Sequence, residues 1–223
     1  MSQDFSFDRI APAYDTLSYL AFGRSLQRAQ QYFLNMIPSQ AKVLIVGGGS
    51  GNILIDLLKN ASPGHITYVE ASATMIRQTE KRIADYCQSN PECAVPTITF
   101  IRGTERDIES TEKYQVVITN FVLDMYSGSS LDEVMARIDN VLSADAIWIF
   151  TDFRYSSHPL KRLWQKPLAL LMYIFFRFTA NINIQSLPNY DTYFRKLAWK
   201  AKQQRSFFGD FISSKVYVRA KSV

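Results

Sequence analysis

The sequence has few of the residues that build disulfide scaffolds, zinc sites or hydrolase triads. Its 223 residues include two cysteines, Cys87 and Cys93, and two histidines, His65 and His158. The cysteines have neither metal-ligand nor redox spacing, and a chain of this length does not need disulfides for its core. We interpret them as free thiols in a reducing compartment. With so few histidines, we expect neither a bound metal nor a Ser-His-Asp site.

The sequence also lacks an apolar run long enough to cross a membrane. The longest run, 168–176, has nine residues, whereas a spanning helix needs about 20. The N-terminal stretch MSQDFSFDRIAPAYD contains acidic residues and no uninterrupted apolar run, so it is not a secretory signal and we expect a cytoplasmic protein. The net charge of +5 is spread along the chain, which permits an anionic partner but is equally typical of a solvated surface.

What the sequence does contain is an alternation of apolar strands and amphipathic helices. The run Val43–Val46 is continuously apolar and mostly β-branched, as in a strand buried on both faces of a parallel sheet. The alternation predicts a Rossmann-like α/β fold, with a mostly parallel seven-stranded sheet and helices on both faces. The expected strands are 43–46, 66–70, 98–101, 116–120, 146–152, 205–208 and 215–221. The expected helices are one that ends before Pro38, a second over 53–58, and others over 73–86, 131–142 and 192–202.

We expect a single domain over residues 1–223, with a helical insertion after the fifth strand. Its four parts are an N-terminal helical segment (1–40), a core (41–153), the insertion (154–192), and a closing helix with two strands (193–223). Ligands of such folds bind at the carboxyl ends of the strands.

A glycine-rich turn follows the first strand, at the position where such folds bind ligands. In Gly47-x-Gly49-x-Gly51 the missing side chains let a ligand approach the backbone, and free N–H groups favour anionic atoms. The dinucleotide pattern G-x-G-x-x-G fails in both registers. Glu70 ends the second strand, where a carboxylate can accept ribose hydroxyls. Taken singly, the glycines are also consistent with a tight turn, and Glu70 with an ion pair.

Four segments, VLIVGGGSGN, YVEASATMI, ITFIRGTERDI and YQVVITNFVLDMY, follow one another over residues 43–126. Together they resemble the cofactor-binding motifs of class I S-adenosylmethionine-dependent methyltransferases. The resemblance implies that Gly47, Gly49 and Gly51 skirt the methionine part of S-adenosylmethionine and that Glu70 holds the ribose. It also implies that Met75 or Ala71 packs on adenine, that Thr104 or Glu105 faces its amino group, and that Asn120 lies beneath the sulfonium. Core packing explains Met75 equally well.

The opening FDRIAPAYD and the segment Ser186-Leu187-Pro188 are similar to the ubiquinone/menaquinone-biosynthesis C-methyltransferase branch. Such entry segments resemble those of many small-molecule methyltransferases, which implies that Tyr14 and Asp15 help to close the cofactor pocket; a local helix cap is the alternative for Asp15. Ile45 departs from the family, because most members carry an acid two residues before the first glycine. Backbone carbonyls near Gly47, or Asp15 or Asn120, would then contact the methionine ammonium.

The implied reaction is direct in-line methyl transfer to a small, apolar or aromatic acceptor. A base is needed only if the acceptor loses a proton, and the candidates near strand ends are Asp124, Tyr126, Asp152 and His158. Helix capping is the alternative for the aspartates, and a loop position for His158.

The insertion 154–192 predicts a helical lid over an apolar, lipid-like acceptor and contact with a membrane surface, because its apolar run is flanked by cations. Packing on the sheet or a homodimer contact is the alternative. Two other functions stay open. A nucleic-acid methyltransferase would use Trp199 and the basic residues between Arg195 and Arg205, although a solvated face is the more usual meaning of such a run. The third reading is a non-catalytic cofactor-binding module.

Overall fold

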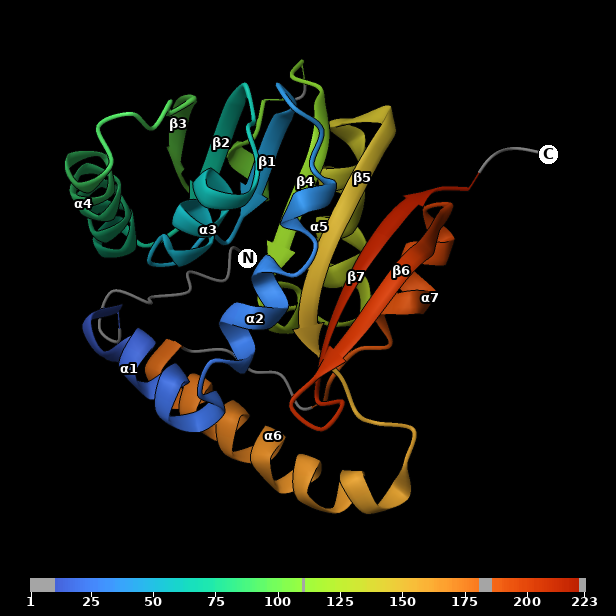
Figure 1. Cartoon of the computed structure of the whole chain (residues 1–223). Helices are drawn as coiled ribbons and strands as arrows, with labels where there is room; N and C mark the ends of the chain where they lie inside the picture. Colours follow the sequence, from blue (N-terminus) through green and yellow to red (C-terminus); the bar gives the residue numbers. More distant parts are fainter. Residues whose placement is uncertain (1–10, 110, 181–185, 221–223) are drawn as a thin grey trace.

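The computed structural model describes residues 11–109, 111–180 and 186–220, with backbone alone for 11–16, 175, 176 and 178–180. Its centre is a seven-stranded sheet in the order β3-β2-β1-β4-β5-β7-β6 (Figure 1). The strands are β1 (Lys42–Val46), β2 (His65–Glu70), β3 (Thr97–Arg102), β4 (Tyr114–Asn120), β5 (Leu142–Phe153), β6 (Trp199–Phe207) and β7 (Ile212–Arg219).

The five strands β1 to β5 pair in parallel, while β7 pairs antiparallel with both β5 and β6. The sheet is therefore mixed, and its parallel part carries the helical crossovers that the sequence predicted. The antiparallel edge has a simple cause. Only residues 208–211 join β6 to β7, and so short a turn can connect antiparallel neighbours but not parallel ones.

Helices cover both faces of the sheet, as predicted (Figure 1). On one face Phe33, Leu54 and Leu57 pack against Val43 and other strand residues. On the other face Leu131, Met135 and Phe194 pack against a second set of strand residues. The helices are α1 (Ala11–Phe22), α2 (Ser25–Gln31), α3 (Asn52–Asn60), α4 (Ala73–Ser89), α5 (Gly128–Asn140), α6 (Pro159–Ala180) and α7 (Tyr190–Lys196), and three short 3-10 turns are η2 (Leu34–Met36), η3 (Glu105–Asp107) and η4 (Leu123–Met125).

Two helix predictions were wrong in extent. The helix expected over 192–202 ends at Lys196, Ala198 has a positive φ of 58°, and strand β6 begins at Trp199. Its Ala, Lys and Gln residues favour a helix locally, but pairing with β7 along the whole strand overrides that preference. The helix expected to end before Pro38 is broken into α2 and the turn η2.

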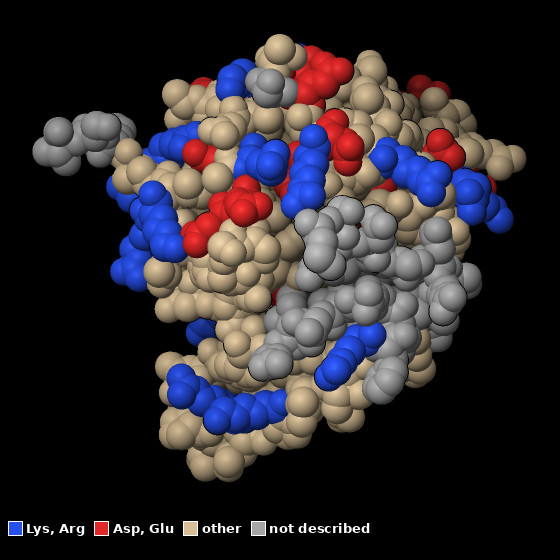
Figure 2. All heavy atoms as spheres, turned by 180° about the vertical axis from the view of Figure 1, so that it is seen from behind, with Lys and Arg blue, Asp and Glu red and all other residues tan. Residues whose placement is uncertain are grey.

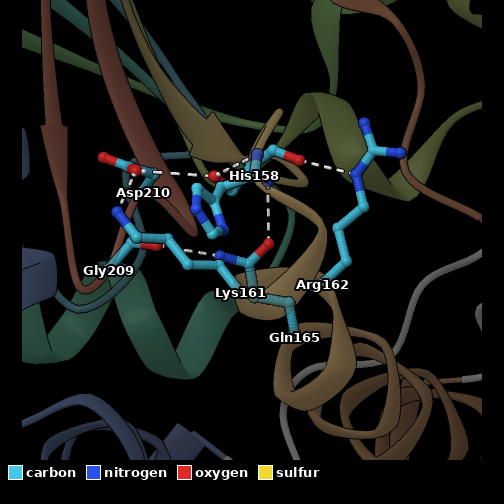
Figure 3. A network of polar contacts seen from close by, with 7 residues as sticks. His158, Lys161, Arg162, Gln165, Gly209 and Asp210 are labelled. Carbon is cyan, nitrogen blue, oxygen red and sulfur yellow. Dashed lines mark hydrogen bonds and ion pairs between the residues drawn. The ribbon is translucent and has the colours of Figure 1, made fainter.

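The predicted insertion is the 22-residue helix α6, which lies below the carboxyl ends of the strands, next to α1 (Figure 1). Among the described residues, no helix is long and apolar enough to cross a membrane. A polar network fastens the first half of α6 to the turn between β6 and β7 (Figure 3). The fully buried Gln165 accepts from the Ser156 amide at 2.8 Å and donates to the Gly209 carbonyl at 2.9 Å, and Lys161 contacts Asp210 at 2.6 Å.

Candidate functional site

A cavity of about 300 Å³ lies at the carboxyl ends of the parallel strands. Its wall combines the glycine turn after β1, the ends of β2 and β4, and the segment after β3. Residues of α1 and α2 complete it, among them Tyr19, Arg24 and Gln27. The location is the one that the strand-helix alternation predicts for a ligand.

The glycine turn has a backbone that only glycine adopts readily. Gly47 and Gly49 line the cavity with φ values of 67° and 66°. A Cβ on Gly47 would lie 2.6 Å from Val122 Cγ2. Gly51, with φ 91°, is the residue before α3 and faces Thr79 instead of the cavity wall. The three predicted glycines therefore divide into two cavity residues and one that shapes the start of a helix.

The sequence reasoning missed Gly48 and the tyrosine beneath it. A Cβ on Gly48 would lie 2.1 Å from Cζ of Tyr68, which is fully buried under the turn. The Tyr68 hydroxyl donates to the Gly49 carbonyl at 2.9 Å, and burial raises the pKa of this tyrosine far above its ordinary value. The turn therefore rests on a neutral phenol. A tyrosine within the second strand, two residues before Glu70, was the available signal.

Glu70 ties the end of β2 to the glycine turn. Its side chain is buried, and Oε2 accepts from the Gly49 amide at 2.8 Å while Oε1 accepts from the Ser72 amide at 2.8 Å. These two bonds hold the carboxylate at the cavity wall, beside the backbone that a bound nucleoside would approach. The structure thus brings together Glu70 and the glycines, the two features that the sequence singled out.

The predicted adenine-side residues also line the cavity. Ala71 and the buried Met75 lie on one side, and Thr104 and Glu105 on the other. The Thr104 hydroxyl caps η3 by accepting from the Arg106 amide at 3.3 Å. Met75 lines the cavity and is also a buried residue of α4, so contact with adenine and core packing are both compatible with its position.

Asn120, which the resemblance places beneath the sulfonium, differs from the other cavity residues in its hydrogen bonding. Its side chain is 8% exposed, lines the cavity, and neither Oδ1 nor Nδ2 has a hydrogen-bond partner in the described part of the chain. Ile45 is 1% exposed and belongs to the apolar core, although it also borders the cavity. At Asn120 the cavity therefore has an amide without a hydrogen-bond partner among the described residues. At Ile45, where most family members carry an acid, its wall is aliphatic.

The base candidates occupy different surroundings. Tyr126 lines the cavity, whereas Asp124 and Asp152 are buried behind it and close enough for their charges to interact. Burial raises the pKa of Asp124 to about 7. The pKa of Asp152 is raised by burial first and then by the Asp124 charge. His158 is exposed at the start of α6, away from the cavity (Figure 3).

Two N-terminal predictions and the predicted lid need separate comment. The side chains of Tyr14 and Asp15 lie outside the described residues. No described residue of α6 lines the cavity, and the wall on that side comes from α1 and α2 instead. The lid prediction concerns the acceptor, so it stays a prediction; the part of the cavity wall that α1 and α2 provide had no signal in the sequence.

Comparison with known proteins agrees with this geometry. Residues 44–148 match the sequence model of a family described as "Methyltransferase domain". The family match agrees with the resemblance found over residues 43–126, while the narrower assignment to the ubiquinone/menaquinone branch stays a prediction. No curated protein matches the sequence.

Solved structures give the same fold at low sequence identity. The chain is similar to the Burkholderia thailandensis 1,6-didemethyltoxoflavin-N1-methyltransferase, with bound 1,6-didemethyltoxoflavin and S-adenosylhomocysteine (12% identity, 96% of this chain and 86% of that one, TM-score 0.66). It is also similar to the N-methyltransferase NodS of Bradyrhizobium japonicum WM9 in complex with S-adenosylhomocysteine (12% identity, 99% of this chain and 100% of that one, TM-score 0.65). The mitomycin 7-O-methyltransferase MmcR is another match (13% identity, TM-score 0.68), and 96% of this chain covers 61% of that protein's length.

Proposed function

We propose that this chain, whose residues 44–148 match the model of a methyltransferase domain, transfers a methyl group from S-adenosylmethionine to a small, apolar or aromatic acceptor. The observation that carries the proposal is the link between Glu70 and the glycine turn. The buried carboxylate is held by the Gly49 and Ser72 amides at the wall of a cavity of about 300 Å³. A carboxylate fixed beside a glycine-rich backbone suits the ribose of a nucleoside cofactor.

The residues around the cavity fit the parts of the donor. Glu70 would accept from the ribose hydroxyls, Ala71 and Met75 would pack on adenine, and Gly47 and Gly49 would border the methionine part. Thr104 or Glu105 would face the adenine amino group, where the Thr104 hydroxyl is already engaged as a cap. Asn120, which needs a partner, would lie at the sulfonium end.

The bound donor supplies an activated methyl group, so the protein has mainly to orient the acceptor and exclude water. The acceptor atom forms a bond to the methyl carbon as the sulfur–methyl bond breaks and its electron pair returns to sulfur. An acceptor O–H or N–H then loses its proton. Asp124, next to the cavity residue Met125 and with a pKa of about 7, is our candidate to take that proton.

Calorimetry with S-adenosylhomocysteine tests the donor site. We expect binding to the wild type and a loss of about 1.5 to 3 kcal/mol in Glu70→Ala, the scale of a hydrogen bond to a charged group. The control is Glu112→Ala, which removes an exposed carboxylate paired with Lys42 far from the cavity. A folded Glu70→Ala protein with wild-type affinity would overturn the ribose assignment.

We also propose that the outer face of α6 contacts a membrane surface from which an apolar acceptor reaches the protein. The leucines of this face recur at helical spacing and are exposed, with Leu163 at 73% and Leu171 at 64%. The helix contains no acidic residue, and the exposed Lys166 and Arg177 follow one edge of the apolar stripe. Figure 2 shows basic and no acidic side chains on the visible face of the lower lobe, where α6 lies. This pattern is typical of a helix at an anionic interface.

Sedimentation with phosphatidylglycerol and phosphatidylcholine vesicles tests the contact. Each cation near an anionic surface contributes about 1 kcal/mol, so Lys166→Ala/Arg177→Ala should weaken binding to phosphatidylglycerol roughly 30-fold. The control Lys200→Ala/Lys202→Ala removes two exposed charges from β6 and should bind like wild type. The proposal is contradicted if the wild type sediments with neither kind of vesicle, or if this face of α6 forms a homodimer contact instead.

A nucleic-acid acceptor has no observation in its favour. The basic run is divided between α7 and the edge strand β6, and Lys196 is paired with Asp132 at 2.8 Å. A non-catalytic role is tested by the same assays, since methyl transfer to any acceptor excludes it.

A further inference from the structure

Unpartnered buried polar atoms gather at one end of the sheet. In globular proteins nearly every buried polar atom has a hydrogen-bond partner, so each exception needs an explanation. Within the described ranges, the side-chain atoms without one are Asn120 Oδ1 and Nδ2, Asp152 Oδ2, Arg154 Nε, Tyr173 Oη, Tyr190 Oη and Ser213 Oγ.

Strand register and ring contacts place these atoms near the carboxyl ends of β4 and β5. Asp152 lies opposite Ser213 in the β5–β7 pairing. The Tyr190 ring packs on Phe150, with centroids 4.8 Å apart, and so lies over the same part of β5. The turn η4, which carries Asp124, also packs against β5.

The local charges have one sign. The charges that act on Tyr173 and Tyr190 come from Asp124, Asp152 and other tyrosines. The nearest arginine in sequence, Arg154, acts instead on Asp191, Asp210 and Tyr217. No described lysine or arginine acts on Asp152. Within the described residues, an acceptor part that enters between Asp124, Asp152 and Tyr190 therefore meets carboxyl and phenol oxygens, while the guanidinium of Arg154 acts on Asp191 and Asp210.

We infer that Asp124, Asp152, Tyr173 and Tyr190 form a subsite for a nitrogen cation of the acceptor, either a protonated amine or a protonated nitrogen heterocycle. The inference rests on the proposed methyl transfer and specifies its acceptor. An N–H group donates to Asp152 Oδ2, the cation balances the acidic pair, and the tyrosine rings suit a cation as well. Asp124 joins this subsite to the donor cavity, because its neighbour Met125 lines that cavity. Burial of both aspartates, which raises their pKa values, agrees with a site that ionises fully only beside a cation.

The first test compares two tyrosines with buried hydroxyls in the protein without ligand. The Tyr173 hydroxyl has no partner among the described residues, whereas the Tyr190 hydroxyl faces Asp152 and the Tyr217 hydroxyl donates to Asp191 Oδ1 at 2.6 Å. If the Tyr173 hydroxyl awaits a ligand, Tyr173→Phe should keep or raise Tm, while Tyr217→Phe should lower it by several degrees. An equal loss of Tm in both variants would mean that the Tyr173 hydroxyl serves the fold, and would overturn the inference.

The second test measures binding of benzylamine, benzyl alcohol and benzoate by NMR titration, with and without S-adenosylhomocysteine. We expect benzylamine to bind at least tenfold more tightly than the alcohol and benzoate not to bind. Asp152→Asn should remove this preference, and Asp132→Asn, at a partly exposed aspartate paired with Lys196, should retain it. Equal binding of the three compounds, or a preference that survives Asp152→Asn, refutes the subsite. If S-adenosylhomocysteine fails to bind, the proposed function fails, while the Tm comparison and the titration without it still decide this inference.

Discussion

Replacing Asp124 with Asn should remove much of the pH dependence of stability. The Asp124 side chain is 8% exposed, and burial raises its pKa from 3.8 to about 7. A carboxyl with a higher pKa in the folded than in the unfolded state is neutral in both states at low pH. Its stabilising contribution is fully present below about pH 4 and is lost as the pH rises through about 7.

The size of the effect follows from the two pKa values. A difference of about 3 between folded and unfolded states corresponds to about 4 kcal/mol in the free energy of unfolding. This is a large part of the 5 to 15 kcal/mol typical of a domain. Asp152 and Asp56, whose pKa values are also raised, act in the same direction. The lowered pKa values of Asp191 and Asp210 have the opposite effect: they make the free energy of unfolding fall as the pH is lowered, but only below about pH 4.

Urea unfolding at pH 5 and pH 8.5 measures the effect. The wild type should lose about 3 kcal/mol or more at the higher pH, because the part of the effect that falls below pH 5 is already lost at the lower one. Asp124→Asn should lose much less, because the amide has no charge and no longer repels Asp152. Asp132→Asn, which alters a partly exposed aspartate paired with Lys196, should retain the wild-type dependence. A wild type that is more stable at pH 8.5, or an Asp124→Asn variant with an unchanged dependence, would refute the reasoning.

Two further predictions concern packing and hydrogen bonds. Gly48→Ala should lower the free energy of unfolding by about 1 to 3 kcal/mol and weaken S-adenosylhomocysteine binding in calorimetry, because its Cβ would overlap the Tyr68 ring. The control Gly128→Ala lies outside the cavity; its positive φ of 55° makes an alanine strained, but S-adenosylhomocysteine binding should stay intact. Gln165→Ala should cost about 2 to 4 kcal/mol in urea unfolding, because it leaves the Ser156 amide and the Gly209 carbonyl without their partner. Lys161→Met, at a half-exposed ion pair, should change stability by less than about 1 kcal/mol.

The parallel half of the fold could be predicted because its signals are local. Val43–Val46 is buried on both faces, and its apolar run is the direct trace of that burial. The two closing strands were predicted, but the first half of β6 could not be, because Lys200 and Lys202 occupy an edge strand whose exposed side chains leave no apolar pattern. Only the β7 partner, paired along the length of β6, makes this segment a strand.

The site shows the same division. Glu70 and the glycines could be found because a strand end and a turn are local features with a known spacing. The Tyr68–Gly48 contact, the wall provided by α1 and α2, and the proximity of Asp124 to Asp152 depend on tertiary packing. Such contacts have no fixed sequence separation, so no spacing rule could have revealed them.

Ile45 shows how this chain departs from the usual donor site. Its register partners are Tyr68 on β2 and Ile118 on β4, and all three side chains belong to one apolar core. A carboxylate at this position would be buried among them without a cation, so the isoleucine agrees with the packing around it. The donor ammonium must then be met by backbone carbonyls or by the amide oxygen of Asn120. Since a neutral acceptor binds an ammonium more weakly than a carboxylate does, the affinity for the donor should depend chiefly on Glu70 and the glycine turn.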